Sequence, residues 1–296
     1  MGSHMINSRF SLASELFRLT VPEYIPMGLA AVIFGFVAST KYAIFPVSLI
    51  FALISTGMAI AGYNAFNAIF DKQIDKINKP QRPLARETIS TKQAFLVSSA
   101  SFILALISAY FVNGVFLCII LVIILIAILY SIPKIHLKKR FVLGTLSAAS
   151  IYVILLPLGG WAIIHATRVP FFLILYLSIF GFASAILKDF EDIIGDDRYK
   201  ARTLPTRLGY SEALTISTIL FIVSAATLEI LVAKKIVPFL YAAVPLITIP
   251  ALANLNSLYK HRNNNNWKKV AIKGMLIFMG AEIMLISLSL FYLYSG

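Results

Sequence analysis

The sequence has little charge and almost no cysteine. Only 13% of its 296 residues are Asp, Glu, Lys or Arg, and Cys118 is the single cysteine. One cysteine excludes an intrachain disulfide framework and a cysteine-ligated metal cluster. Soluble domains carry about a quarter charged residues. A chain that is 59% hydrophobic, with a mean hydropathy of +0.86, is therefore not an ordinary soluble domain, and we predict an integral membrane protein.

Long apolar runs account for most of the sequence. A helix needs about 20 apolar residues to cross the hydrocarbon layer of a bilayer. We predict nine such spans, which makes the fold class all-α: a polytopic membrane protein built as a nine-helix transmembrane bundle. The expected spans are 15–38, 44–69, 92–111, 114–131, 141–165, 170–188, 212–233, 237–257 and 270–294.

The N-terminal region carries two further signals. Residues 1–5 read Met-Gly-Ser-His-Met, which is typical of the remnant of an expression tag. We predict that residues 6–296 form a single transmembrane domain. No cleavable signal peptide is evident, because Glu15, Arg18 and Glu23 interrupt the first apolar run.

Basic residues are distributed unevenly over this span plan. Of the 26 Lys and Arg residues, 22 fall in the N-terminal segment and in the even-numbered loops, which are those that follow spans 2, 4, 6 and 8. The other side holds only Lys41, Arg168, Lys234 and Lys235. Lys and Arg accumulate on the cytoplasmic side of a membrane protein. We expect the N-terminus and the even-numbered loops in the cytoplasm and the C-terminus outside. The same asymmetry explains the net charge of +13, so no nucleic-acid partner is expected.

The aspartates are concentrated in two places. All six fall in two short segments, each at the cytoplasmic end of a predicted span: Asp71 and Asp75 after the second, and Asp189, Asp192, Asp196 and Asp197 after the sixth. Ionisable groups at membrane depth are costly and are usually functional. An acidic surface that merely balanced a basic cytoplasmic face would not need all six in two clusters.

Both segments repeat one spacing. Polar residues recur at every fourth position, at Asn67, Asp71 and Asp75 in the first segment and at Lys188, Asp192 and Asp196 in the second. On a continuing helix this interval forms a single polar stripe. The offset from position 71 to position 192 is 121 residues and spans four predicted helices. An even number of helices makes the two copies point the same way, so we predict a parallel internal repeat.

Paired carboxylates indicate a metal site. Mg²⁺ binds one or two carboxylates together with substrate phosphates. Carboxylates alone would repel a diphosphate, so the metal has to bridge them, while Arg and Lys hold the remaining phosphate oxygens. Four basic residues on the same side of the membrane could do so: Arg82, Lys134, Lys188 and Arg202.

At these residues the chain resembles the UbiA-type intramembrane prenyltransferases. The stretch from Asn67 to Asp75, followed by Asn-Lys-Pro-Gln-Arg-Pro-Leu at 78–84, is similar to the first signature of that family. Lys-Asp-Phe-Glu-Asp at 188–192, running on to Arg-Thr-Leu-Pro at 202–205, is similar to the second. Tyr130 and Lys134 resemble a Tyr and Lys pair in the loop after the fourth span. The family commonly has Asp directly after the Asn, whereas this chain has Ala68.

The resemblance implies Mg²⁺-dependent transfer of a prenyl group from a polyprenyl diphosphate to an acceptor, with release of diphosphate in an intramembrane site. Geranylgeranyl diphosphate is the favoured donor. The acceptor is either an aromatic ring or the glycerol phosphate of an ether lipid, in lipid or quinone biosynthesis, and the sequence leaves this open. The expected compartment is the cytoplasmic membrane, with the active site facing the cytoplasm.

The resemblance also assigns roles. The expected catalytic metal carboxylates are Asp71, Asp75, Asp192 and Asp196, with Asn67 as a further metal ligand. The expected diphosphate-binding residues are Arg82, Tyr130, Lys134, Lys188 and Arg202, although Lys188 could instead pair locally with Asp192. We expect Asp189, Glu191 and Asp197 to contact and orient these residues rather than to bind the metal or the diphosphate themselves.

Two other function classes are compatible with acidic residues at the ends of membrane spans. A secondary transporter could use them as a coupling-ion site. Many transporters, however, have inverted repeats and bind their substrate at the membrane midplane, whereas the repeat predicted here is parallel and its charges lie at span ends. A phosphotransferase acting on a nucleotide-activated alcohol also uses intramembrane Asp and Mg²⁺. Such enzymes have Gly directly after an Asp, whereas Ile193 follows Asp192 here, and Asp71 and Asp75 would remain unexplained.

Overall fold

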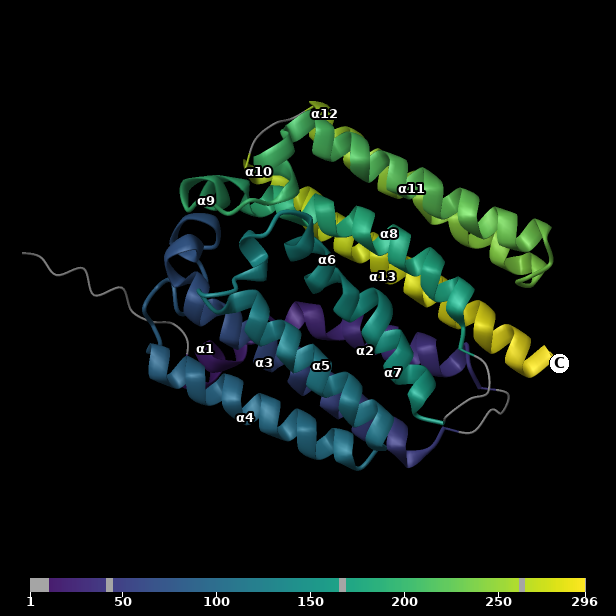
Figure 1. Ribbon diagram of the computed structural model, residues 1–296, viewed down its shortest axis with the longest axis horizontal. Coiled ribbons are helices and arrows are strands. Elements are labelled where there is room, and N and C mark those ends of the chain that lie inside the picture. The colour runs from purple at the N-terminus through teal and green to yellow at the C-terminus, as the bar shows by residue number, and fades with distance from the viewer. Residues whose placement is uncertain (1–10, 41–44, 165–168, 261–263, 296) are drawn as a thin grey trace, which may run out of the picture.

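The computed structural model describes residues 11–40, 45–164, 169–260 and 264–295, and the predicted tag remnant, Lys41 and Arg168 lie outside them. Within these ranges the chain forms a bundle of long helices lying side by side (Figure 1). The helices in the first half of the chain are α1 (Leu12–Leu19), η1 (Pro22–Tyr24), α2 (Ile25–Val37), α3 (Val47–Asn78), α4 (Thr91–Tyr110), α5 (Gly114–Ser131) and η2 (Leu137–Lys139). Those that follow are α6 (Val142–Ser150), η3 (Ile151–Leu155), α7 (Leu156–Ala162), α8 (Phe171–Asp189), η4 (Phe190–Asp192), α9 (Ile193–Arg198), α10 (Leu204–Leu208), α11 (Tyr210–Ala233), η5 (Phe239–Ile247), α12 (Thr248–Lys260) and α13 (Asn264–Ser295).

The predicted helical bundle is confirmed. Eight helices in the described ranges are long and apolar enough to cross a membrane, and there are nine if the bent pair Leu12–Leu19 and Pro22–Val37 is one span. This pair bends by 44°. The bend occurs because Val21 adopts a left-handed backbone conformation, with φ 49°, and Pro22 follows it. A β-branched residue rarely adopts positive φ, since its Cβ crowds the backbone.

The helix α3 is longer than the predicted span. It continues beyond residue 69 to Asn78, so Asp71 and Asp75 lie on the same helix as the membrane span, as the four-residue spacing predicts. Likewise α8 runs through Asp189 and passes, by way of η4, into α9. Both aspartate segments are therefore extensions of long helices, and the packing of the bundle fixes their positions.

Small residues let the helices α2 and α7 pack backbone against backbone. A Cβ atom added to Gly160 would lie 2.0 Å from the Val32 carbonyl oxygen, and one added to Gly35 would lie 1.8 Å from that of Pro157. Such small-residue contacts are typical of helices that associate in a membrane, where apolar burial alone gives little preference for protein over lipid.

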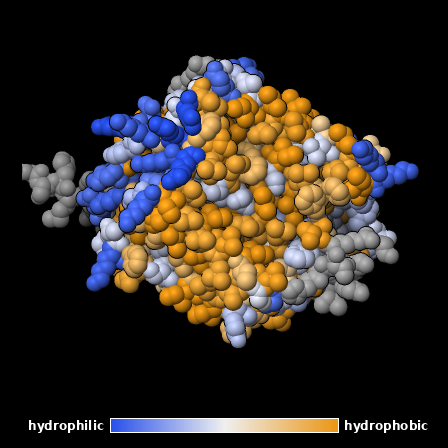
Figure 2. All heavy atoms as spheres, in the orientation of Figure 1, coloured by the Kyte–Doolittle hydropathy of each residue, from blue (hydrophilic) through white to orange (hydrophobic). Residues whose placement is uncertain are grey.

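The surface of the bundle is divided by polarity. Apolar side chains cover the middle of the visible face, and hydrophilic side chains gather mainly at the end where α9 lies in Figure 1 (Figure 2). Exposed apolar residues such as Phe95, Leu125 and Ile222 project from the outer helices. This band is the surface expected to contact lipid, since exposed apolar patches of this extent are rare on soluble monomers.

Candidate active site

The two aspartate segments meet at one end of the bundle. Asn78, the last residue of α3, donates its side-chain Nδ2 to the backbone carbonyl of Asp192 at 2.8 Å. Its Oδ1 accepts from the backbone N–H of Gly195 at 2.7 Å. A Cβ at position 195 would lie 2.6 Å from both side-chain atoms, so only glycine permits this approach. Asn78 and Gly195 thus form a clasp that joins the first aspartate segment to the second.

Each of three buried carboxylates contacts a cation, and in two of the three pairs that cation comes from another segment of the chain. Asp71 pairs with Lys138, and Arg82 donates to Asp75 at 2.8 Å. The ammonium of Lys79 lies 2.7 Å from each carboxylate oxygen of Asp192. These carboxylates are 1–8% exposed. Buried charges are expensive unless they are paired, so these contacts explain how the acids are tolerated in the bundle.

Lys138 is the most informative of these cations. It belongs to η2, between α5 and α6, and is itself buried. Burial alone would lower the pKa of Lys138, but the surrounding negative charges, that of Asp71 first among them, together outweigh burial and place this pKa well above its ordinary value. Lys138 therefore remains a cation at neutral pH and is available to a phosphate.

Several polar atoms at the centre of the site have no protein partner among the described residues. They are Oδ1 of Asp71, Oδ1 of Asp196 and Nδ2 of Asn67, all buried. The two oxygens are hard donors with free lone pairs, the ligand type that Mg²⁺ prefers. Within the described ranges, no three His, Cys, Asp or Glu side chains are gathered into a ready-made cage. The donor set thus fits a metal that takes few protein ligands and completes its coordination with phosphate oxygens.

The structure places the predicted diphosphate-binding residues unequally. Arg82 is part of the centre, whereas Lys134 and Arg202 are exposed. Arg202 forms a backbone bridge with Arg140, so it lies beside the loop that carries Lys138. Lys188 is exposed as well, with its ammonium 5.6 Å above the ring of Tyr24.

The remaining predicted residues surround the centre. The ring of Tyr130 packs edge-on against Tyr63 at 5.8 Å, on the apolar side of the aspartates. Asp189 accepts a hydrogen bond from Thr145 at 2.7 Å, and Asp197 is exposed. In the described part of the chain, no hydrogen bond or ion pair of the Asp197 side chain supports its predicted role, whereas Asp189 is hydrogen-bonded to α6.

Three residues of the centre were not singled out from the sequence: Asn78, Lys79 and Lys138. The first two lie inside the first motif, so the motif itself was a signal, but the sequence does not show that they cross to Asp192. Lys138 lies four residues after Lys134 in the same basic loop. Which of the two faces inward depends on the turn at His136, whose φ is 44°, and a residue pattern does not reveal that turn.

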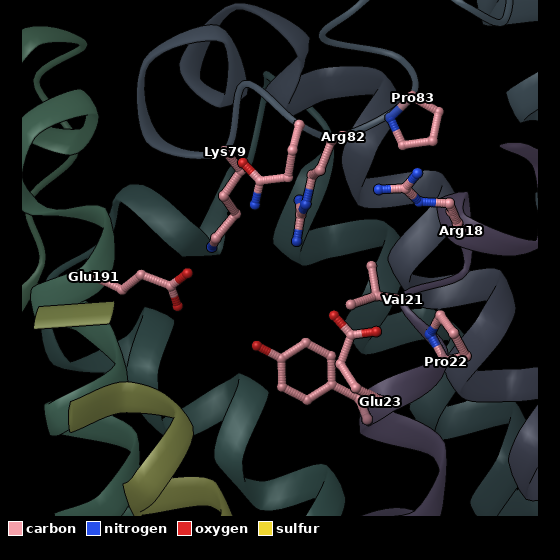
Figure 3. A pocket seen from close by; sticks show the side chains of 10 residues that line it. Arg18, Val21, Pro22, Glu23, Lys79, Arg82, Pro83 and Glu191 are labelled. Carbon is pink, nitrogen blue, oxygen red and sulfur yellow. The ribbon is translucent and has the colours of Figure 1, made fainter. Parts of the chain in front are cut away.

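A cavity adjoins the centre and is partly open to solvent; its empty space, the open part included, is about 610 Å³. Side chains from three stretches of the chain converge on it (Figure 3). They are Arg18, Glu23 and Tyr24 from α1 and η1, Lys79, Gln81 and Arg82 from the loop after α3, and Glu191 from η4. Lys79 and Arg82 thus line the cavity and also contact the carboxylates Asp192 and Asp75.

Comparison with known proteins decides the family. The sequence model of the UbiA prenyltransferase family matches residues 28–280. The chain belongs to the UbiA prenyltransferase family. A relative from Sulfurisphaera tokodaii, a digeranylgeranylglyceryl phosphate synthase, is 31% identical over 199 residues, which cover 67% of this chain and 70% of that protein. A digeranylgeranylglyceryl phosphate synthase from Metallosphaera sedula is 28% identical over 265 residues, covering 82% and 87%.

A solved structure shares the fold. The UbiA homologue from Archaeoglobus fulgidus bound to DMAPP and Mg²⁺ has a TM-score of 0.71 and 21% sequence identity, with 92% of this chain and 99% of that chain covered. Membership of the UbiA family confirms the predicted fold class and the predicted enzyme class, a membrane prenyltransferase. The transporter and phosphotransferase alternatives are therefore set aside.

Proposed function

We propose that this UbiA-family prenyltransferase catalyses Mg²⁺-dependent transfer of a geranylgeranyl group from geranylgeranyl diphosphate to the free glycerol hydroxyl of a phosphate-bearing ether lipid. The observation that supports this proposal most strongly is that the Asn78–Gly195 clasp brings both aspartate segments together in one charged centre. The relatives from Sulfurisphaera tokodaii and Metallosphaera sedula, named for a product with two geranylgeranyl groups on glyceryl phosphate, support the choice of acceptor.

The described residues supply most of what prenyl transfer needs. The bond between the allylic carbon and the diphosphate breaks, the electron pair leaves with the diphosphate, and the hydroxyl oxygen bonds to the carbon as its proton departs. Asp71, Asp75 and Asn67 would hold one Mg²⁺, and Asp192 and Asp196 another, to neutralise the leaving group. Lys79, Arg82 and Lys138 already lie at these carboxylates and would bind the phosphate oxygens of the bound diphosphate.

The bundle also protects the reactive carbon. An allylic cation reacts with water unless water is excluded, so we place the reactive carbon toward the apolar interior of the bundle and only the diphosphate at its polar end. The faces of Tyr63 and Tyr130, which pack beside the aspartates, can stabilise positive charge. We place this centre at the cytoplasmic side of the cell membrane, with the N-terminus inside, because 22 of the 26 basic residues fall on that side of the span plan.

A comparison of acceptors tests this function. Purified protein in detergent is incubated with geranylgeranyl diphosphate, Mg²⁺ and one of three acceptors: geranylgeranylglyceryl phosphate, 4-hydroxybenzoate or a dihydroxynaphthoate. Mass spectrometry of the products should show the digeranylgeranyl ether with the first acceptor only. Alkylation of an aromatic acceptor at a higher rate would overturn the choice of acceptor while leaving the enzyme class intact.

A further inference from the structure

The cavity in Figure 3 has a chemical character of its own. On one side it is lined by three cations, Arg18, Lys79 and Arg82, and elsewhere by the carboxylates of Glu23 and Glu191. Building on the proposed function, we propose that this cavity binds the phosphate-bearing glycerol headgroup of the acceptor, and that Arg18 is the residue that recognises its phosphate.

The position of the cavity suits a second substrate. Lys79 and Arg82 form a wall shared with the carboxylate centre: each lines the cavity and contacts an aspartate, at 2.7 Å and 2.8 Å respectively. A headgroup in the cavity would therefore share the wall formed by Lys79 and Arg82 with the proposed metal and diphosphate centre. Binding both reactants in adjoining parts of one site lowers the entropic cost of bringing them together.

The charges in the cavity match a glycerol phosphate. A phosphate monoester is a dianion with acceptor oxygens only, which Arg binds through two parallel hydrogen bonds. Its glycerol hydroxyl is a donor, for which the carboxylates of Glu23 and Glu191 are suitable acceptors. Val21, Pro22 and Pro83 add apolar surface where the ether-linked chain could begin. One cavity therefore offers complementary groups for all three parts of the acceptor.

Arg18 is held in place by the way α1 is anchored. Glu15, one turn earlier on α1, is buried and accepts hydrogen bonds from Arg86 at 2.7 Å and Thr88 at 2.6 Å, which fixes α1 to the loop that begins with Lys79. Beyond Arg18, the left-handed conformation of Val21 turns the chain into η1. Rare backbone conformations persist where the surrounding structure over-determines them, often at ligand-binding sites. Arg18 and Glu23 consequently face the cavity from either side of one bend.

The test combines variants with paired acceptors. Wild type, Arg18→Gln, Arg18→Lys and the control Arg198→Gln, an exposed arginine on α9 outside the cavity lining, are assayed with geranylgeranylglyceryl phosphate and with its phosphate-free analogue, geranylgeranylglycerol. Loss of a bidentate contact to phosphate should raise the KM for the phosphorylated acceptor about 10- to 100-fold in Arg18→Gln. The KM for geranylgeranyl diphosphate and the rate with the phosphate-free acceptor should match wild type, and Arg18→Lys should recover part of the loss.

Two results would overturn the assignment of Arg18. One is an equal loss with both acceptors, which would indicate a structural role, and the other is a changed KM for geranylgeranyl diphosphate, which would place Arg18 at the donor. If wild type fails to use the phosphorylated lipid, the proposed acceptor is wrong, and the cavity is tested by calorimetric binding of sn-glycerol 1-phosphate. Equal affinity in wild type and Arg18→Gln would then refute the phosphate site. Tight binding of this free compound would instead show that the lipid chains are not needed.

Discussion

Replacing Asn78 by Ala should separate the two halves of the site. The change removes the hydrogen bonds to the Asp192 carbonyl and from the Gly195 N–H, at 2.8 Å and 2.7 Å. A typical intramolecular hydrogen bond contributes about 0.5–1.5 kcal/mol net, and a buried polar group left without a partner costs about 1–3 kcal/mol. We therefore expect Asn78→Ala to lower the free energy of unfolding by roughly 2–5 kcal/mol. Because the change also frees Asp192 to move, it should reduce the turnover rate by a larger factor than it reduces the affinity for substrate.

A double-mutant cycle with Gly195 isolates the clasp. In Gly195→Ala the new Cβ would lie 2.6 Å from the side chain of Asn78, so this variant should be destabilised by the clash. In Asn78→Ala the obstructing atoms are gone, so adding Gly195→Ala should cost little more. The two changes should thus be strongly non-additive, as expected for residues in contact. Additive losses in melting temperature would refute the clasp.

Asn113 provides a matched control for the assay. It also makes two side-chain hydrogen bonds, donating to the Ala162 carbonyl at 2.8 Å and accepting from the Phe116 N–H at 2.9 Å, but it precedes α5 at the opposite end of that helix from the site. Melting temperature in detergent and release of diphosphate are measured for both Ala variants. Similar melting losses with turnover reduced only in Asn78→Ala support the reasoning, whereas equal losses of turnover would show that general destabilisation explains the effect.

Three further predictions follow from the site and the topology. Excess EDTA should abolish turnover, and added Mg²⁺ or Mn²⁺ should restore it, since the donor set is carboxylate oxygen; full activity in EDTA would refute the metal role. Lys138→Met should reduce turnover at least 100-fold, because it removes the buried partner of Asp71 and leaves that carboxylate uncompensated. Lys134→Met, at an exposed position, should change turnover by less than about threefold. In a Cys118→Ser background, a membrane-impermeant thiol reagent applied to whole cells should label Lys234→Cys but not Lys92→Cys, and the reverse pattern would invert the proposed orientation.

Much of the fold could be predicted from the sequence, because lipid imposes strong rules on it. The span 114–131 coincides with α5, and the other predicted spans overlap the observed helices, since about 20 apolar residues in a row have few other stable conformations. The bend at Val21 was not predicted. A β-branched residue gives no local signal for positive φ, and the conformation is set by tertiary contacts such as those of Glu15.

The site was predictable in composition but not in its pairing. The four-residue spacing correctly indicated that Asp71 and Asp75 share the helix α3, and the offset repeat predicted that the second aspartate segment lies at the same membrane face as the first. Long side chains from loops are the part that spacing cannot predict. Lys138 rather than Lys134 contacts Asp71, and Lys79 crosses from the first segment to Asp192, because each depends on the path of an irregular loop. The cavity beside Arg18 is likewise made by three segments that are distant in the sequence.

Whether both aspartate segments serve one prenyl-transfer site is decided by single-turnover release of diphosphate from geranylgeranyl diphosphate. The proteins compared are wild type, Asp71→Asn, Asp192→Asn and the double variant, with melting curves to confirm folding. Each single change keeps side-chain size and should lower the rate by several orders of magnitude, and the double should be scarcely slower than the slower single, because groups that act as a unit are non-additive. A single variant near the wild-type rate, or losses that multiply in the double, would contradict a shared site.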